Sequence, residues 1–106
     1  MTNLAATTDR IHTLLAGIER GVQPDRPHLE ETLTDGYACA LTLDAECRRL
    51  ERCISVRAER LADGSGEEAH ELSRLARLLT SRRGELRSLR ELLAVLKNGA
   101  REPKVA

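Results

Sequence analysis

Cysteine thiols are the most reactive side chains in this sequence, and their spacing argues against catalysis. There are three of them and no C-x-x-C pair, so the pattern predicts neither a disulfide framework nor a zinc motif. Cys39 and Cys53 lie two heptads apart on one predicted helical stripe. That spacing is about 21 Å along a helix, too long for a disulfide bridge within one chain. No neighbouring residue suggests a base that would activate a thiol. We therefore expect reduced thiols that pack as small apolar side chains.

A metal site is the second chemistry to weigh, because Glu67 and His70 have the Glu-x-x-His spacing of di-iron bundles. In those bundles the motif occurs twice and projects inward with two further glutamates, whereas here it occurs once and His70 takes an outward position. His12 and His28 have no cysteine or carboxylate pair at ligand spacing. Glycine-rich phosphate loops and a serine nucleophile elbow are also missing from the sequence. We expect no catalytic residue, no metal, no cofactor and no enzymatic activity.

Arginine is the strongest candidate for binding a ligand, with 15 of the 17 basic residues. Five arginines are predicted to meet midway along a helical hairpin: Arg48, Arg49, Arg52, Arg82 and Arg83. Like charges that converge are unfavourable unless opposite charges neutralise them. The favoured interpretation is neutralisation by nearby internal carboxylates. A partner protein's acidic surface and a phosphate-bearing ligand remain as alternatives.

Two breaks divide the sequence into helical segments. The first holds Gly21 as a helix C′ residue, two prolines, and Asp25 as a cap for the next helix. The second surrounds Gly64, where Ser65 and Glu68 have capping-box spacing. We predict a single helical domain over residues 1–106, with helices at about residues 3–20, 26–62 and 66–98 and a frayed tail at residues 99–106.

Leucine and alanine dominate the last two segments in a repeat of alternating threes and fours. Such heptads, joined by a short turn, predict an all-α fold: a short N-terminal helix and a long antiparallel coiled-coil hairpin. In this register Gly36 and Ala40 lie opposite Leu93 and Leu89. Arg82 takes a seam position, where a polar residue can fix the register. Charge order supports the pairing, because the second segment runs from acidic to basic and the third does the same.

One flank of the predicted hairpin carries a second apolar stripe, which two helices cannot bury together with their seam. We predict that it binds a partner through Cys39, Cys53, Val56, Leu78, Leu92 and Val95. The amphipathic first helix is long enough to cover about half of the hairpin, beginning at the Leu29 end. The half near the turn needs another partner, so we expect oligomerisation, most simply a homodimer that completes a helical bundle.

Composition excludes several classes of protein. Of 106 residues, 41% are hydrophobic and only Tyr37 is aromatic, while 17 basic residues balance 17 acidic ones. That balance removes the general field that drives non-specific binding to nucleic acid. No apolar run approaches the roughly 20 residues of a membrane helix, and residues 1–4 do not resemble the start of a signal peptide. We expect a soluble, cytoplasmic protein that does not bind membranes.

The predicted outline is similar to that of helical-hairpin adaptors, export chaperones and hairpin anti-sigma regulators, a similarity of shape alone. We therefore expect a non-enzymatic protein-protein interaction module, acting as an adaptor, chaperone or regulator, that self-associates and binds a protein partner. The alternative is a regulator that binds nucleic acid or an anionic nucleotide through the arginine cluster. Residues 74–104 favour it, with nine basic residues against three acidic ones. The lack of aromatic residues that stack on bases opposes it.

Overall fold

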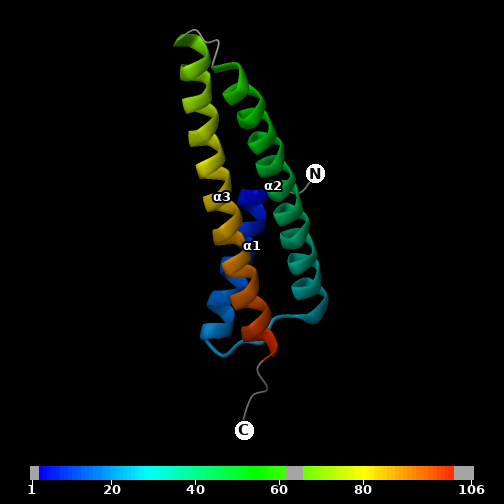
Figure 1. The fold of residues 1–106 in the computed structure, drawn as a ribbon. Coiled ribbons are helices and arrows are strands. Elements are labelled where there is room, and N and C mark those ends of the chain that lie inside the picture. Colours follow the sequence, from blue (N-terminus) through cyan, green and yellow to red (C-terminus); the bar gives the residue numbers. More distant parts are fainter. Residues whose placement is uncertain (1–2, 62–65, 102–106) are drawn as a thin grey trace. The chain divides into compact units, whose positions relative to one another are not determined.

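The chain is described by a computed structural model covering residues 3–61 and 66–101, and these residues form three helices and no strand. The helices are α1 (Leu4–Glu19), α2 (Arg26–Leu61) and α3 (Gly66–Arg101), shown in Figure 1. The prediction of an all-helical chain is confirmed. The expected turn at Gly64 with its capping box, and the tail after residue 101, lie outside the described residues.

The break between α1 and α2 has the caps that its residues predict. Gly21 has a φ of 82°, and its N–H donates to the Ile18 carbonyl at 2.9 Å, as in a Schellman motif. A side chain with a Cβ rarely adopts that φ, so glycine is the residue suited to end α1. Asp25 Oδ2 then accepts a hydrogen bond from the His28 N–H at 3.3 Å and caps the start of α2.

The described residues pack as two compact units. Unit 1 comprises residues 3–41 and 88–101, which are α1, the first part of α2 and the last part of α3. Unit 2 comprises Thr42–Arg87, which hold the remainder of α2 and α3. Unit 1 therefore has three helical segments to cover its core, whereas unit 2 has two.

Unit 1 has a core of aliphatic side chains drawn from all three of its segments. Its buried apolar residues include Ile11, Leu14, Ala40, Leu89, Leu93 and Leu96. Gly36 lies against the Leu93 side chain, as the heptad register predicts. Near the end of α3, Gly99 lies beside Ile18 of α1, and a Cβ added there would be 3.6 Å from the Ile18 Cγ2. This packing supports helix past Gly99, so α3 runs to Arg101 and not to the expected residue 98.

Unit 2 is a pair of antiparallel helical segments. Its buried apolar side chains are Leu43, Cys47, Leu75, Leu79 and Leu86. Ion pairs connect Arg57 with Glu68 at 3.3 Å and Glu51 with Arg83 at 2.7 Å. Positions on α3 rise as positions on α2 fall, so the two segments run in opposite directions.

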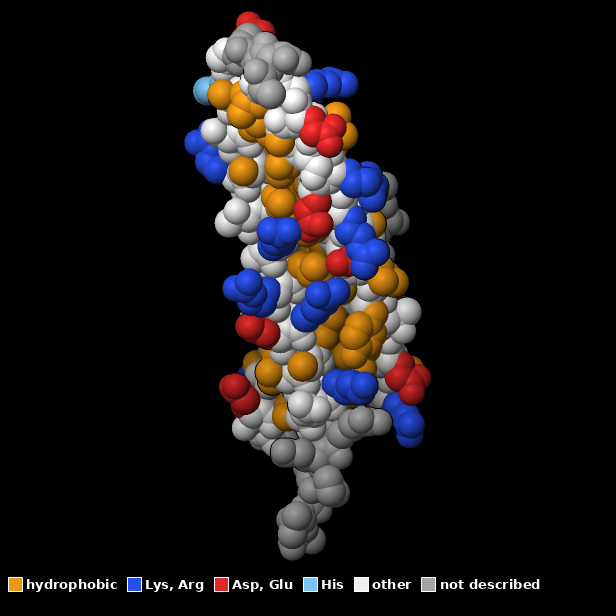
Figure 2. Space-filling view, viewed as in Figure 1, with side chains coloured by type: hydrophobic (Ala, Val, Ile, Leu, Met, Phe, Trp, Pro, Cys, Tyr) orange, Lys and Arg blue, Asp and Glu red, His pale blue; other side chains and the backbone are white. Residues whose placement is uncertain are grey.

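The face of the helices drawn in Figure 2 carries charges of both signs. Figure 2 shows Lys and Arg side chains interspersed with Asp and Glu, and hydrophobic side chains between them. Within residues 3–61 and 66–101, no helix is both long enough and apolar enough to cross a membrane.

Candidate interaction surfaces

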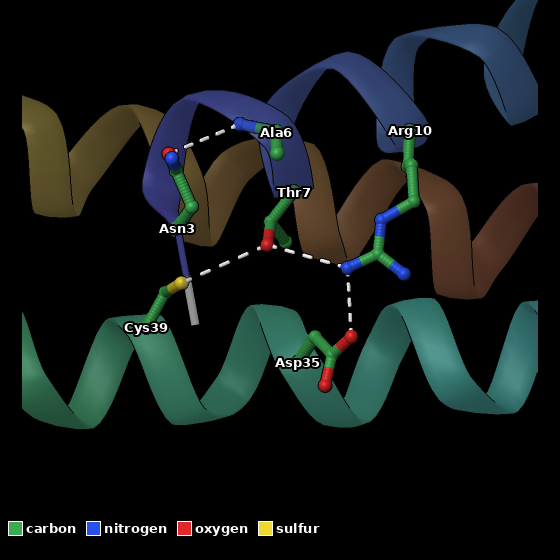
Figure 3. Close-up of polar contacts among 6 residues, drawn as sticks. All are labelled: Asn3, Ala6, Thr7, Arg10, Asp35 and Cys39. Carbon is green, nitrogen blue, oxygen red and sulfur yellow. Dashed lines mark hydrogen bonds and ion pairs between the residues drawn. The ribbon is translucent and has the colours of Figure 1, made fainter. Parts of the chain in front are cut away.

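α1 lies on one flank of α2 in unit 1 and is held there by a short chain of polar contacts (Figure 3). Thr7 is completely buried, and its Oγ1 accepts from the Cys39 thiol at 3.9 Å. Arg10 donates to Asp35 Oδ2 at 2.7 Å, and both side chains are about one-third exposed. Since Thr7 meets Cys39 and Arg10 meets Asp35, α1 runs antiparallel to α2 along this flank.

Three of the predicted partner-binding residues belong to unit 1, and they differ in exposure. Cys39 is only 5% exposed because α1 covers it, so it is a core residue of unit 1 and not part of an open surface. Leu92 is half-buried, whereas Val95 is 56% exposed. The first helix was expected to cover this end of the stripe, and Thr7 of α1 covers Cys39 there.

Thr32 is a buried polar residue that the sequence did not single out. It is completely buried in unit 1, and its Oγ1 has no hydrogen-bond partner among the described residues. A buried polar atom without a partner costs about 1 to 3 kcal/mol of stability. The Thr32 hydroxyl is therefore a point at which the packing of unit 1 loses stability.

The corresponding flank of unit 2 has no third helical segment. Cys53 is exposed, Val56 is 48% exposed and Leu78 is half-buried. All three were predicted to bind a partner, and all three belong to unit 2. We call Cys53, Val56, Leu78 and the neighbouring Arg49 the unit 2 flank.

Arg82 lies at the seam between α2 and α3 in unit 2, with carboxylates of both helices beside it. Its Nη1 donates to Glu85 Oε1 at 2.8 Å, and its Nε lies 3.3 Å from Glu46 Oε2. The hydrogen bond to Glu85 and the charges of Glu46 and Glu85 raise the pKa of the Arg82 guanidinium above its usual value. The cation therefore links the two helices and is occupied by internal partners.

Of the other four arginines of the cluster, two have ion-pair partners among the described residues and two do not. Arg83 pairs with Glu51 at 2.7 Å, and Arg48 pairs with Asp44 at 3.2 Å. Arg49 and Arg52 are exposed and make no ion pair with any residue that the structure describes. Internal carboxylates thus neutralise three of the five arginines, and two are left available.

Two surface hollows were not foreseen from the sequence. One, of about 460 Å³, lies on unit 2 and brings Arg48 and Arg52 together with Glu51, Ser55 and Val56. The other, of about 450 Å³, lies on unit 1 and is lined by residues that include Pro24, Arg26, Leu29, Glu30, Leu33 and Lys97. Both mix apolar side chains with charges of both signs.

Burial affects the chemistry of the Cys47 thiol. Burial raises the pKa of the Cys47 thiol above its ordinary value, although the charge of Arg83 acts in the opposite direction. A thiol with a raised pKa stays protonated at neutral pH and is a poor nucleophile. Across residues 3–61 and 66–101, no group of three or more His, Cys, Asp or Glu side chains is placed to hold a metal ion.

Comparisons of this chain with protein-family models, with curated proteins and with solved structures give no match.

Proposed function

We propose that the chain is a non-enzymatic helical interaction module whose unit 2 binds helices of another polypeptide. One observation carries the proposal. Cys39 and Cys53 occupy the same heptad position two heptads apart on α2, yet Cys39 is 5% exposed beneath α1 and Cys53 is exposed. The same heptad position is therefore covered by a helix in unit 1 and left uncovered in unit 2, which has no third helical segment.

Apolar surface on the unit 2 flank favours such coverage. Val56 is 48% exposed and lies one turn of helix beyond Cys53, while Leu78 contributes from α3. Burying apolar surface contributes about 25 cal/mol per Å². A helix laid along these side chains therefore gains free energy that unit 2 alone does not obtain.

A second copy of the chain is the simplest source of helices. In this arrangement α2 and α3 form an antiparallel coiled-coil hairpin, and two hairpins complete a four-helix bundle around unit 2. The ion pair between Glu51 and Arg83, at predicted flanking positions, supports the coiled-coil register. Capture of a protein partner by the same flank would make the module an adaptor or regulator. A cytoplasmic location suits its three unpaired thiols.

Light scattering with two variants of α3 tests the proposed self-association. Leu78→Glu places a charge on the flank, whereas Ser73→Glu adds the same charge at an exposed position of the outer face. We expect the parent chain and Ser73→Glu to associate at tens of micromolar and Leu78→Glu to associate much more weakly. A parent chain that stays monomeric at that concentration would refute self-association.

A second candidate function rests on the two available arginines. Arg49 and Arg52 have no described ion-pair partner, and Arg52 lines a hollow together with Arg48. These cations would favour a phosphate-bearing ligand such as nucleic acid or a nucleotide. We expect only weak binding in a fluorescence-anisotropy titration at about 150 mM salt, because the other arginines are neutralised internally. Sub-micromolar binding that falls steeply with salt would place this function first.

A further inference from the structure

Three residues of α2 occupy one heptad position along the open side of unit 2. Glu46, Cys53 and Arg60 follow one another at intervals of seven residues. Residues separated by whole heptads face the same side of a helix that is paired with α3, so Glu46 and Arg60 lie on the same side as Cys53. The two charges are opposite in sign and equally distant from Cys53 along the helix.

Both of these charges are able to take a further partner. Arg60 is exposed and makes no ion pair with any residue that the structure describes. Glu46 shares the Arg82 guanidinium with Glu85, and the Arg82 Nη1 donates its hydrogen bond to Glu85 at 2.8 Å. The Glu46 side chain is 36% exposed. One cation therefore faces two carboxylates, and a negative charge is left over at this end of the flank.

The remaining charges on this side of unit 2 favour neither an acidic nor a basic partner. Glu71 pairs with Arg74 at 2.6 Å, while Arg49 and Glu67 are exposed charges of opposite sign. The arginines and glutamates on this side are equal in number: Arg49, Arg60, Arg74 and Arg82 against Glu46, Glu67, Glu71 and Glu85. A two-fold interface is self-complementary, so a balanced surface with opposite charges at matched spacing suits a second copy of itself.

We propose that two copies of the chain associate with α2 antiparallel to α2 of the second copy and with the two-fold axis beside Cys53. Rotation about this axis places Glu46 of each copy opposite Arg60 of the other, because seven residues separate each of them from Cys53. It also brings Arg49 nearly level with Val56 of the second copy, whose exposed apolar surface the arginine stem can cover. This inference rests on the proposed function, since it specifies the residues by which the chain recognises itself.

Exchange of the two charges between copies tests the pairing. Glu46→Arg and Arg60→Glu each replace two attractive contacts with two repulsive ones, so each variant alone should associate about tenfold more weakly than the parent chain in light scattering. In an equimolar mixture the exchanged charges are again opposite, and association should return to the parent level. Rescue by mixing also shows that neither variant has unfolded. Glu59→Arg, an exposed neighbour of Arg60 on the outer face, should associate as the parent does.

Oxidative crosslinking tests the position of the axis. Two cysteines can form a disulfide when their Cα atoms lie within about 7 Å, and an axis beside Cys53 brings the two Cys53 thiols together. Mild oxidation with diamide should therefore give a covalent dimer linked through Cys53, and Cys53→Ser should abolish it because Cys39 and Cys47 are buried. A chain that associates without any dimer linked through Cys53 would refute this axis.

Failure of this inference differs from failure of the proposed function. If the parent chain associates and Leu78→Glu prevents it, while the charge variants associate normally or the mixture is not rescued, the pairing of Glu46 with Arg60 is overturned and the flank remains a docking surface. A parent chain that stays monomeric at tens of micromolar would overturn this inference together with self-association, and a partner protein would remain as the occupant of the flank.

Discussion

Two glycines in the helices provide a stringent test of the packing in unit 1. A Cβ built on Gly36 would overlap the Leu93 Cδ2 and lie 3.3 Å from its Cγ. Leu93 is 1% exposed, so its side chain has little room to move aside. Gly84, in the middle of α3, has no atom within 4 Å of an added Cβ. The pair Gly36→Ala and Gly84→Ala therefore adds the same methyl group to a crowded site and to an open one.

The expected magnitudes follow from two opposing effects. Replacing glycine with alanine inside a helix contributes about 1 kcal/mol of stability at either position. Forcing an extra methyl group into a packed core costs about 1 to 3 kcal/mol, and only Gly36→Ala incurs this cost. Gly84→Ala should thus raise the free energy of unfolding by about 1 kcal/mol, whereas Gly36→Ala should leave it unchanged or lower it by up to about 2 kcal/mol.

Urea denaturation followed by far-ultraviolet circular dichroism measures both values. The difference between the two variants isolates the cost of placing a Cβ on Leu93, because the gain in helix propensity is common to both. If Gly36→Ala stabilises the chain as much as Gly84→Ala does, then α2 and α3 do not meet at Gly36 and the register of unit 1 is wrong.

Four further predictions concern buried and paired side chains. Thr32→Val should raise the free energy of unfolding by about 1 kcal/mol, because it removes a buried hydroxyl without a partner; a lower melting temperature would contradict this. In dilute solution iodoacetamide should alkylate Cys53 far faster than Cys39 or Cys47, and mass spectrometry showing equal rates would mean that the cores are open. Burial raises the pKa of Cys47 in the folded chain, so its contribution to stability is complete below the unfolded-state pKa of about 8.5 and is lost as pH rises through the folded-state value. Denaturation over an alkaline pH series should therefore show a steeper loss for the parent chain than for Cys47→Ala, and equal slopes would contradict the assignment. Arg82→Ala should lower the urea midpoint by an amount that shrinks in high salt, since it leaves two carboxylates facing each other; an unchanged midpoint would show that the cation is not structural.

Local signals in the sequence were sufficient to predict three helices and one of the contacts between them. Gly21 and Asp25 cap the break between α1 and α2 because backbone geometry there depends on residues close in the chain. The contact between Gly36 and Leu93 followed from the heptads, since a periodic apolar face leaves few registers that bury it.

Contacts between distant residues were harder to predict. The sequence predicted that α3 ends at about residue 98 and that a frayed tail follows, but Gly99 packs beside Ile18 and α3 continues to Arg101. The sequence analysis predicted that Cys39 binds a partner, because periodicity alone does not reveal how closely α1 approaches this residue. The partner chosen by each arginine depends on the rotamer of a long side chain, which heptad position alone does not determine.

The rate of Cys53 alkylation across a series of chain concentrations tests the central claim most directly, because it reports on the flank itself. If unit 2 binds helices of another polypeptide, the rate should fall as the 11.7 kDa chain associates, and Leu78→Glu should restore the fast rate of the dilute chain. A rate that stays at the value for a free, exposed thiol at every chain concentration would contradict the account.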